Sequence, residues 1–235
     1  KEFICKIKKK YPHLKIVLGG KHATSWKEQC LKECEELDAL VYGEGEDSFL
    51  NLVNNNLKNN KINGTVIRKD DKIIINPPDK TVNINKLAFP LFNLIDIRKY
   101  EPNIGFHYKK PFIHLVSSRG CYLNCNFCDS KGKIRIRNYK NILSETELLF
   151  HKYKIKTINF YDDYNIFTQD KKEAIKLCKG IIKKKLSFNW SIYLESFDID
   201  SSLLKLMKSA GCFRIHCPIE SGVQKNRDMI KPNHI

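Results

Sequence analysis

The second half of the sequence alternates strand and helix signals, and this alternation limits the folds open to the chain. From Phe112 onward, short apolar runs typical of buried strands are separated by amphipathic helical segments. Consecutive strands joined by helices form parallel sheets. We therefore expect an α/β fold with an incomplete (βα) barrel over 109–235. The predicted strands are 112–117, 157–161, 188–194 and 213–219, and the predicted helices are 144–153, 170–185 and 201–209.

Local signals place two of these helix ends. Ser144 and Glu147 have the spacing of a capping box, so we expect the first helix of the barrel to begin at Ser144. Gly211 follows the last predicted helix, where glycine is a common C-terminal cap.

The first half of the sequence predicts a smaller α/β domain over 1–78. Two short apolar strands, 14–18 and 39–42, each end in a glycine-containing turn. Helical spacing is expected for 1–10, 26–37 and 48–57, and a β-hairpin for 62–76. Pro77-Pro78 interrupts regular structure, and 79–108 is predicted to be a linker.

The composition of the chain indicates neither a membrane protein nor a secreted one. No apolar run is long enough to span a membrane, and no signal peptide is recognisable. The chain lacks an initiator Met, and we expect it to be a fragment of a longer protein. Its nine cysteines are an odd number with irregular spacing, which favours free or metal-bound thiols in a reducing, cytoplasmic compartment.

The formal net charge of +16 has two interpretations. It suits a nucleic-acid partner, or it reflects lysines spread over exposed faces. Lysine is far more frequent than arginine here, whereas phosphate and base recognition favour arginine, so we prefer the second interpretation.

Three cysteines follow the first predicted barrel strand, at Cys121, Cys125 and Cys128. Three thiolates this close in sequence can hold one compact metal centre, and soft sulfur ligands select iron–sulfur clusters or zinc. Structural zinc normally has four protein ligands, and only His107 or His114 lies near enough in sequence to supply the fourth. A cubane cluster held by three cysteines would instead keep one iron open to a substrate.

This loop resembles the signature of the radical S-adenosylmethionine (SAM) superfamily, in which an aromatic residue precedes the third cysteine, as Phe127 does here. The resemblance implies a [4Fe–4S] cluster on the three cysteines. The open iron would bind the methionyl group of SAM, and reductive cleavage would give a 5′-deoxyadenosyl radical. It also implies that Phe127 packs near the adenine.

Two other strand ends resemble the subgroup that joins a cobalamin domain to the radical SAM barrel. Asp162 and Asp163 follow the second barrel strand, where relatives hold the methionyl amino group. Glu220 and Ser221 follow the fourth strand, where the subgroup has a Gly-x-Glu-Ser-Gly sequence that lines the ribose and methionyl region. Here Pro218 stands in place of the first glycine.

The first domain resembles the C-terminal part of a Rossmann-like cobalamin-binding domain. Gly19 and Gly20 end its first strand, and Gly43-Glu44-Gly45-Glu46 follows its second. The resemblance implies that Gly19 and Gly20 let the backbone approach the nucleotide tail of the corrinoid. The segment 89–96 also resembles the connection between the two domains in such enzymes.

The function implied is methyl transfer to an unactivated carbon of a small-molecule or natural-product substrate, with cobalamin carrying the methyl group, or a related radical rearrangement. An electron donor such as flavodoxin or ferredoxin would be needed. Two alternatives stay open. One is a methylthiotransferase-like enzyme that modifies tRNA, and the other is a non-catalytic module that binds zinc or nucleic acid.

Overall fold

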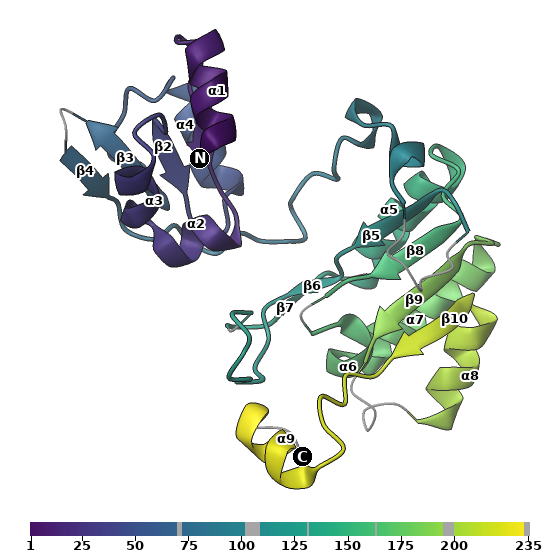
Figure 1. Cartoon of the computed structure of the whole chain (residues 1–235). Coiled ribbons are helices and arrows are strands. Elements are labelled where there is room, and N and C mark those ends of the chain that lie inside the picture. The colour runs from purple at the N-terminus through teal and green to yellow at the C-terminus, as the bar shows by residue number, and fades with distance from the viewer. Residues whose placement is uncertain (70–71, 102–108, 131, 163, 195–199, 233–235) are drawn as a thin grey trace. The chain divides into compact units, whose positions relative to one another are not determined.

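The computed structural model describes residues 1–235 except 70–71, 102–108, 131, 163, 195–199 and 233–235. The chain forms two compact units, Lys1–Asn83 and Ile84–Ile235 (Figure 1). The first unit continues past Pro78 because the following segment packs back onto it. The backbone N–H of Val82 donates to Glu44 Oε2 (3.2 Å), and the Ser48 hydroxyl donates to Asp79 Oδ2 (2.9 Å).

The first unit is a four-stranded sheet in the order β1-β2-β3-β4 with helices packed against it. β1 and β2 are parallel, and β3 and β4 form the antiparallel hairpin that the sequence predicts. The strands are β1 (Val17–Leu18), β2 (Ala39–Val41), β3 (Thr65–Lys69) and β4 (Lys72–Ile75). The helices are α1 (Glu2–Lys10), α2 (Lys21–Trp26), α3 (Glu28–Glu33) and α4 (Glu46–Asn54).

The helix predicted over 26–37 is wrong. The chain forms two short helices there, which meet at Lys27 in a left-handed conformation (φ +38°). The apolar positions Cys30 and Leu37 are nevertheless buried, whereas Trp26 is 58% exposed at the end of α2. Helical spacing thus predicts the buried positions, but it does not reveal the break at Lys27.

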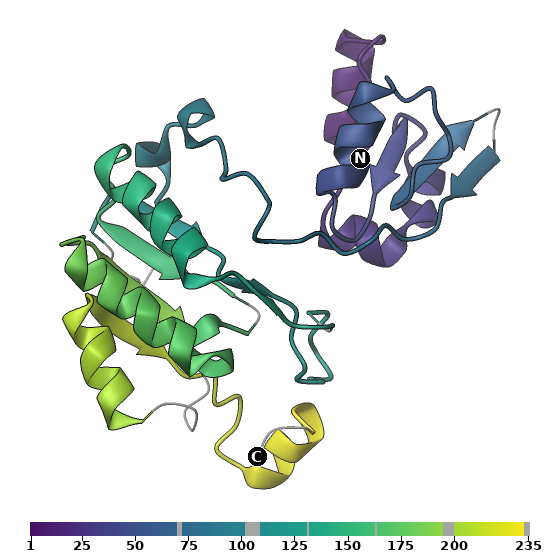
Figure 2. The ribbon, with the colours of Figure 1, turned by 180° about the vertical axis from the view of Figure 1, so that it is seen from behind.

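The second unit contains a parallel four-stranded sheet in the order β10-β9-β8-β5, which confirms the predicted strand–helix alternation. Helices α5, α7 and α8 lie side by side on one face of this sheet, as the two opposite views show (Figure 1 and Figure 2). The strands are β5 (Phe112–Leu115), β8 (Thr157–Phe160), β9 (Asn189–Tyr193) and β10 (Cys212–His216). The helices are α5 (Tyr139–His151), α6 (Ile166–Gln169), α7 (Lys171–Lys183), α8 (Ser201–Ser209) and α9 (Gln224–Ile230), with single 3-10 turns at Phe92–Leu94 and Ile97–Lys99.

The capping box predicted at Ser144 is wrong. Helix α5 begins at Tyr139, because the Asn138 side chain accepts a hydrogen bond from the backbone N–H of Asn141 (2.9 Å). Ser144 therefore lies inside the helix. For α8 the predicted and observed bounds agree, with Asp200 as its N-terminal cap and Gly211 just beyond its end at φ +95°.

The core of the second unit lies between the sheet and its helices. Trp190 is fully buried, with its ring 5.4 Å from that of Phe160 and 5.1 Å from that of Phe167. Cys178 of α7 belongs to the same core, and burial raises the pKa of its thiol to about 12. This packing fixes the carboxyl ends of the four strands relative to one another. In the described part of the chain, no helix combines the length and the apolar character that a membrane crossing requires.

Candidate metal centre

The three-cysteine loop projects from the carboxyl end of β5 as the tip of a two-stranded ribbon. Strand β6 (Ser118–Arg119) pairs antiparallel with β7 (Arg135–Ile136), so both ends of the loop are fixed. Gly120 follows β6 at φ +88°, and a Cβ there would lie 2.5 Å from the carbonyl oxygen of Lys133. Only glycine fits this turn without displacing the backbone of the returning strand.

Backbone hydrogen bonds fold the loop around its cysteines. The N–H of Cys128 donates to the carbonyl of Cys125 (3.2 Å), and the N–H of Gly132 donates to the carbonyl of Cys121 (3.1 Å). The N–H of Ser130 donates to the sulfur of Cys128 (3.4 Å), a contact that strengthens when the sulfur is a thiolate. Cys121 and Cys125 are buried and Cys128 is half-buried, so the structure brings all three predicted ligands to one short loop.

The donor set distinguishes between kinds of metal site. Among the described residues, no group of three His, Cys, Asp or Glu side chains is arranged to hold a single metal ion. Two thiolates on one tetrahedral zinc would lie about 3.8 Å apart, given Zn–S bonds of about 2.3 Å. In a cubane cluster each thiolate binds a different iron and the sulfurs lie farther apart. Three thiolates carried by one loop match the donor type that iron–sulfur clusters use.

The histidines considered as a fourth zinc ligand do not join the loop in the described part of the chain. His114 lies in the middle of β5, where its Nδ1 is 3.1 Å from Asn159 Nδ2 and its ring is 5.2 Å from that of Tyr161. Burial lowers the pKa of His114. His107 lies outside the described residues.

Asp162, just beyond β8, binds the start of the loop segment. Its carboxylate accepts hydrogen bonds from the N–H of Ser117 (2.5 Å), the hydroxyl of Ser117 (2.6 Å) and the N–H of Ser118 (3.1 Å). Burial raises the pKa of Asp162 to about 6, although these hydrogen bonds and Arg137 oppose the shift. The carboxylate thus fastens β8 to the end of β5. Asp163 lies outside the described residues.

Arg137 also fixes the loop, and sequence analysis did not identify it. Its guanidinium forms a buried ion pair with Glu145 of α5 (2.6 Å), and it donates to the carbonyl of Val116 (2.7 Å) and to Asn141 Oδ1 (2.7 Å). The sequence signal was Glu145, a carboxylate on the otherwise apolar face of α5 that carries Ile142. A buried carboxylate requires a cationic partner.

The other predicted site residues lie at strand ends or on the loop. Phe127 is 62% exposed at the loop tip. Glu220 follows β10 at φ +62°, with Oε1 3.2 Å from the ammonium of Lys231. The hydroxyl of Ser221 accepts from the N–H of Val223 (3.1 Å).

A pocket of about 250 Å³ lies within the first unit, at the carboxyl ends of β1 and β2. Gly19 and Gly20 line it. Val41 and Phe49 also line it. The pocket is bordered mainly by glycine and apolar side chains, so it offers shape and backbone groups to a ligand.

Known proteins resemble this chain both over its second half and over most of its length. A family model described as the radical SAM superfamily matches residues 115–235. An uncharacterized methyltransferase of Pyrococcus horikoshii is 32% identical over 214 residues, which cover 88% of this chain and 45% of that protein. An anaerobic magnesium-protoporphyrin IX monomethyl ester cyclase of Rubrivivax gelatinosus is 30% identical over 232 residues, covering 93% of this chain and 41% of that protein.

The chain therefore spans less than half the length of these two relatives. A solved structure with the same fold is that of the cobalamin-dependent S-adenosylmethionine radical enzyme OxsB with aqua-cobalamin and S-adenosylmethionine bound. It matches with a TM-score of 0.77 at 18% identity, covering 100% of this chain and 36% of that one. Since the family model covers just over half of the chain and includes the three-cysteine loop, the chain belongs to the radical SAM superfamily.

Proposed function

We propose that this chain is part of a cobalamin-dependent radical SAM enzyme that transfers a methyl group to a small-molecule substrate. The observation that carries the proposal is the placement of Cys121, Cys125 and Cys128 on one ribbon-held loop at the carboxyl end of β5. In (βα) barrels this end of the strands holds the catalytic groups. When bound, a [4Fe–4S] cluster and SAM would supply the one-electron reduction that cleaves a carbon–sulfur bond.

The chain's own residues would position these groups. The three thiolates would hold three irons, and the N–H of Ser130 would stabilise the thiolate of Cys128. Phe127, exposed beside Cys128, is available to pack against the adenine. Asp162 holds the root of the loop through Ser117, so we assign it a positioning role. Asp163 and Ser221 remain proposed contacts of SAM, with Glu220.

Support for cobalamin comes from the first unit. The Gly19–Gly20 turn lines a pocket at the ends of two parallel strands, where backbone groups can approach a ligand closely. The structurally similar OxsB is described as cobalamin-dependent. We propose that the first unit is the C-terminal part of a cobalamin-binding domain. Methyl transfer is favoured because one relative is named a methyltransferase. The other is named a cyclase, so a related radical rearrangement is the second candidate reaction.

A small external donor such as flavodoxin or ferredoxin would supply the electron. The substrate would be a small molecule or natural product, approached from the carboxyl ends of the barrel strands.

The test is anaerobic reconstitution with iron and sulfide. The proposal expects about four irons and four sulfides per chain, with broad absorbance in the visible blue. Cys125→Ala should lose the cluster, whereas Cys178→Ala, in the hydrophobic core, should keep it. Stoichiometric zinc without this absorbance would overturn the proposal, and equal losses in the two variants would show that the ligands are wrong.

A further inference from the structure

A buried lysine follows the last described helix. The Lys231 side chain is only 4% exposed, and its ammonium lies 3.0 Å from the carbonyl oxygen of Pro218 and 3.2 Å from Glu220 Oε1. A buried ammonium is costly unless it is paired and hydrogen-bonded. Both partners lie in the short turn after β10, so the charge of Lys231 is directed at that turn.

The turn itself is conformationally demanding. Glu220 has φ +62°, a left-handed conformation that is unfavourable for a residue with a Cβ. The N–H of Ser221 donates to the carbonyl of Ile219 (2.7 Å), which tightens the turn around Glu220. Lys231 contacts the strained residue Glu220 itself and Pro218, two positions before it. Both contacts stabilise the turn.

The same helix end is also bonded to the three-cysteine loop. The backbone N–H of Asn126 donates to the carbonyl of Ile230 (2.9 Å), and its side-chain amide donates to the carbonyl of Met229 (2.5 Å). These are among the last carbonyls of α9, which have no partner within the helix. Asn126 lies between Cys125 and Phe127, and both ribbon views place the loop next to α9 (Figure 1 and Figure 2).

We propose that Lys231 is a positioning residue that couples the three-cysteine loop to the Glu220 turn. The inference rests on the proposed function, since the loop would hold the cluster and the turn would contact SAM. A molecule that binds an iron on the loop and a carboxylate on the turn needs the distance between them fixed. Residues 229–231 fix this distance. The carbonyls of Met229 and Ile230 accept hydrogen bonds from Asn126, and the Lys231 ammonium pairs with Glu220.

The ion pair leaves Glu220 able to bind a second donor. A carboxylate offers about four acceptor positions, and Lys231 uses Oε1. Carboxylate oxygens accept hydrogen bonds from hydroxyl and ammonium groups. Hydroxyl and ammonium groups are the donors that a ribose and an amino acid present.

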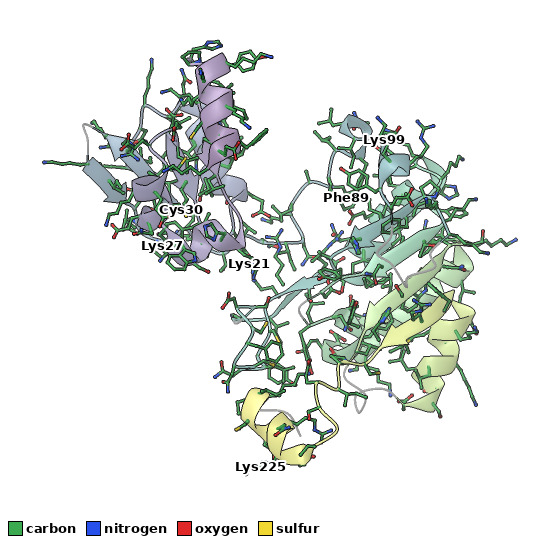
Figure 3. All side chains as sticks on the ribbon, in the orientation of Figure 1. Lys21, Lys27, Cys30, Phe89, Lys99 and Lys225 are labelled. Carbon is green, nitrogen blue, oxygen red and sulfur yellow. The ribbon has the colours of Figure 1, made fainter. Side chains whose placement is uncertain are left out.

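The experiment compares Lys231→Met with Lys225→Met in the longest available form of the protein. Lys225 is exposed on α9 and extends away from it in Figure 3, so its replacement removes the same charge from the same helix. The first readout is iron content after anaerobic reconstitution. The second is SAM affinity of the iron-loaded protein, measured by equilibrium dialysis with labelled SAM.

We expect both variants to keep about four irons per chain, with SAM affinity at least about tenfold weaker in Lys231→Met and unchanged in Lys225→Met. Lys231→Arg should recover part of the affinity, because it restores the cation. In the Glu220→Gln background, Lys231→Met should have little further effect, since the two residues act through one contact.

Equal SAM affinities in Lys231→Met and Lys225→Met, or additive effects of the Lys231 and Glu220 changes, would overturn the inference. Absence of iron in the wild-type protein would instead overturn the proposed function. If Lys231→Met does not fold, Lys231→Gln keeps a donor for Pro218 without the charge, and the same loss of affinity is expected. Hydrogen exchange at the Asn126 amide provides a check without cofactors: exchange should be faster in Lys231→Met than in Lys225→Met.

Discussion

The Asp162 carboxylate accepts hydrogen bonds from both the backbone N–H (2.5 Å) and the hydroxyl (2.6 Å) of Ser117. Two neighbouring parallel strands are thereby joined beyond their last paired residues, where the three-cysteine loop begins. The link ties the geometry of the loop to the packing of the sheet.

We expect Asp162→Asn to change how the stability of the second unit depends on pH. Burial raises the pKa of Asp162 from 3.8 to about 6, so folding takes up a proton between these values. The Asp162 contribution to stability is therefore largest below about pH 4, falls as the pH rises to about 6 and is constant above. The fall amounts to about 3 kcal/mol, at about 1.4 kcal/mol per pKa unit.

In the Asp162→Asn variant, the free energy of unfolding should not show this fall between about pH 4 and 6. The free energy of unfolding can be measured by urea unfolding at pH values from 4 to 7. The signal is the fluorescence of the buried Trp190 in a Trp26→Phe background. Identical pH profiles for the two proteins would show that Asp162 titrates normally in the folded state.

Gly120→Ala should destabilise the loop more than Gly132→Ala does. Both glycines have positive φ values (+88° and +144°), so each substitution introduces backbone strain of about 1–3 kcal/mol. At Gly120 the new methyl group would also lie 2.5 Å from the Lys133 carbonyl, whereas nothing lies within 4 Å at Gly132. This overlap adds about 1–3 kcal/mol. Thermal unfolding and iron uptake should both rank Gly120→Ala as the weaker protein; the reverse order would contradict the ribbon geometry.

Glu145→Gln should cost about 3–5 kcal/mol of stability, because it leaves the buried guanidinium of Arg137 without its counter-ion. Glu147→Gln, on the same helix, breaks an exposed pair with Lys184 (2.8 Å) and should cost less than about 1 kcal/mol. Chemical denaturation measures the free energy of unfolding of both variants. Equal midpoints would mean that the Arg137 network does not support the fold.

Gly19→Val should reduce cobalamin binding while keeping the fold. A Cβ at Gly19 would meet only the Val41 carbonyl, at an ordinary contact distance of 3.7 Å, so a larger side chain can be accommodated by entering the pocket. Hydroxocobalamin affinity, measured by equilibrium dialysis, should fall at least about tenfold, or about 1.4 kcal/mol. An unchanged thermal midpoint is the control. Unaltered affinity would place cobalamin elsewhere.

Periodicity and glycine positions were sufficient to predict the four strands of the parallel sheet and helices α5, α7 and α8, but not the β6–β7 ribbon, α6 or α9. Strands near Thr157 and Asn189 and the helix Ser201–Ser209 were predicted because apolar spacing and strong end signals coincide there. The β3–β4 hairpin was predicted for the same reason, since two β-branched runs flank a short polar turn. Local signals and tertiary packing agree in these segments.

Two predictions about helix bounds failed, each because of a feature that local sequence spacing does not reveal. Ser144 and Glu147 have capping-box spacing, but Asn138 caps α5 earlier, and an ion pair with Glu145 ties the helix to Arg137, just before that cap. The helix expected over 26–37 breaks at Lys27, whose positive φ no sequence pattern announced.

Sequence spacing predicted the cysteines of the site but not the residues that position them. The cysteines were identified from spacing and from the strand that precedes them. Arg137 and Lys231 were not, because their roles depend on buried partners distant in the sequence or on the exact register of a turn. A single lysine in a lysine-rich sequence gives no signal that it is buried.

The pairing of β6 with β7 has a consequence for the order of assembly. Holding both ends of residues 120–134 together restricts the conformations of the loop before any iron arrives. The entropy loss of closing the loop then belongs to folding of the polypeptide and does not reduce the affinity for the metal. The polypeptide would in this respect be a preorganised chelator, because a ribbon of backbone hydrogen bonds already holds the two ends of the loop together.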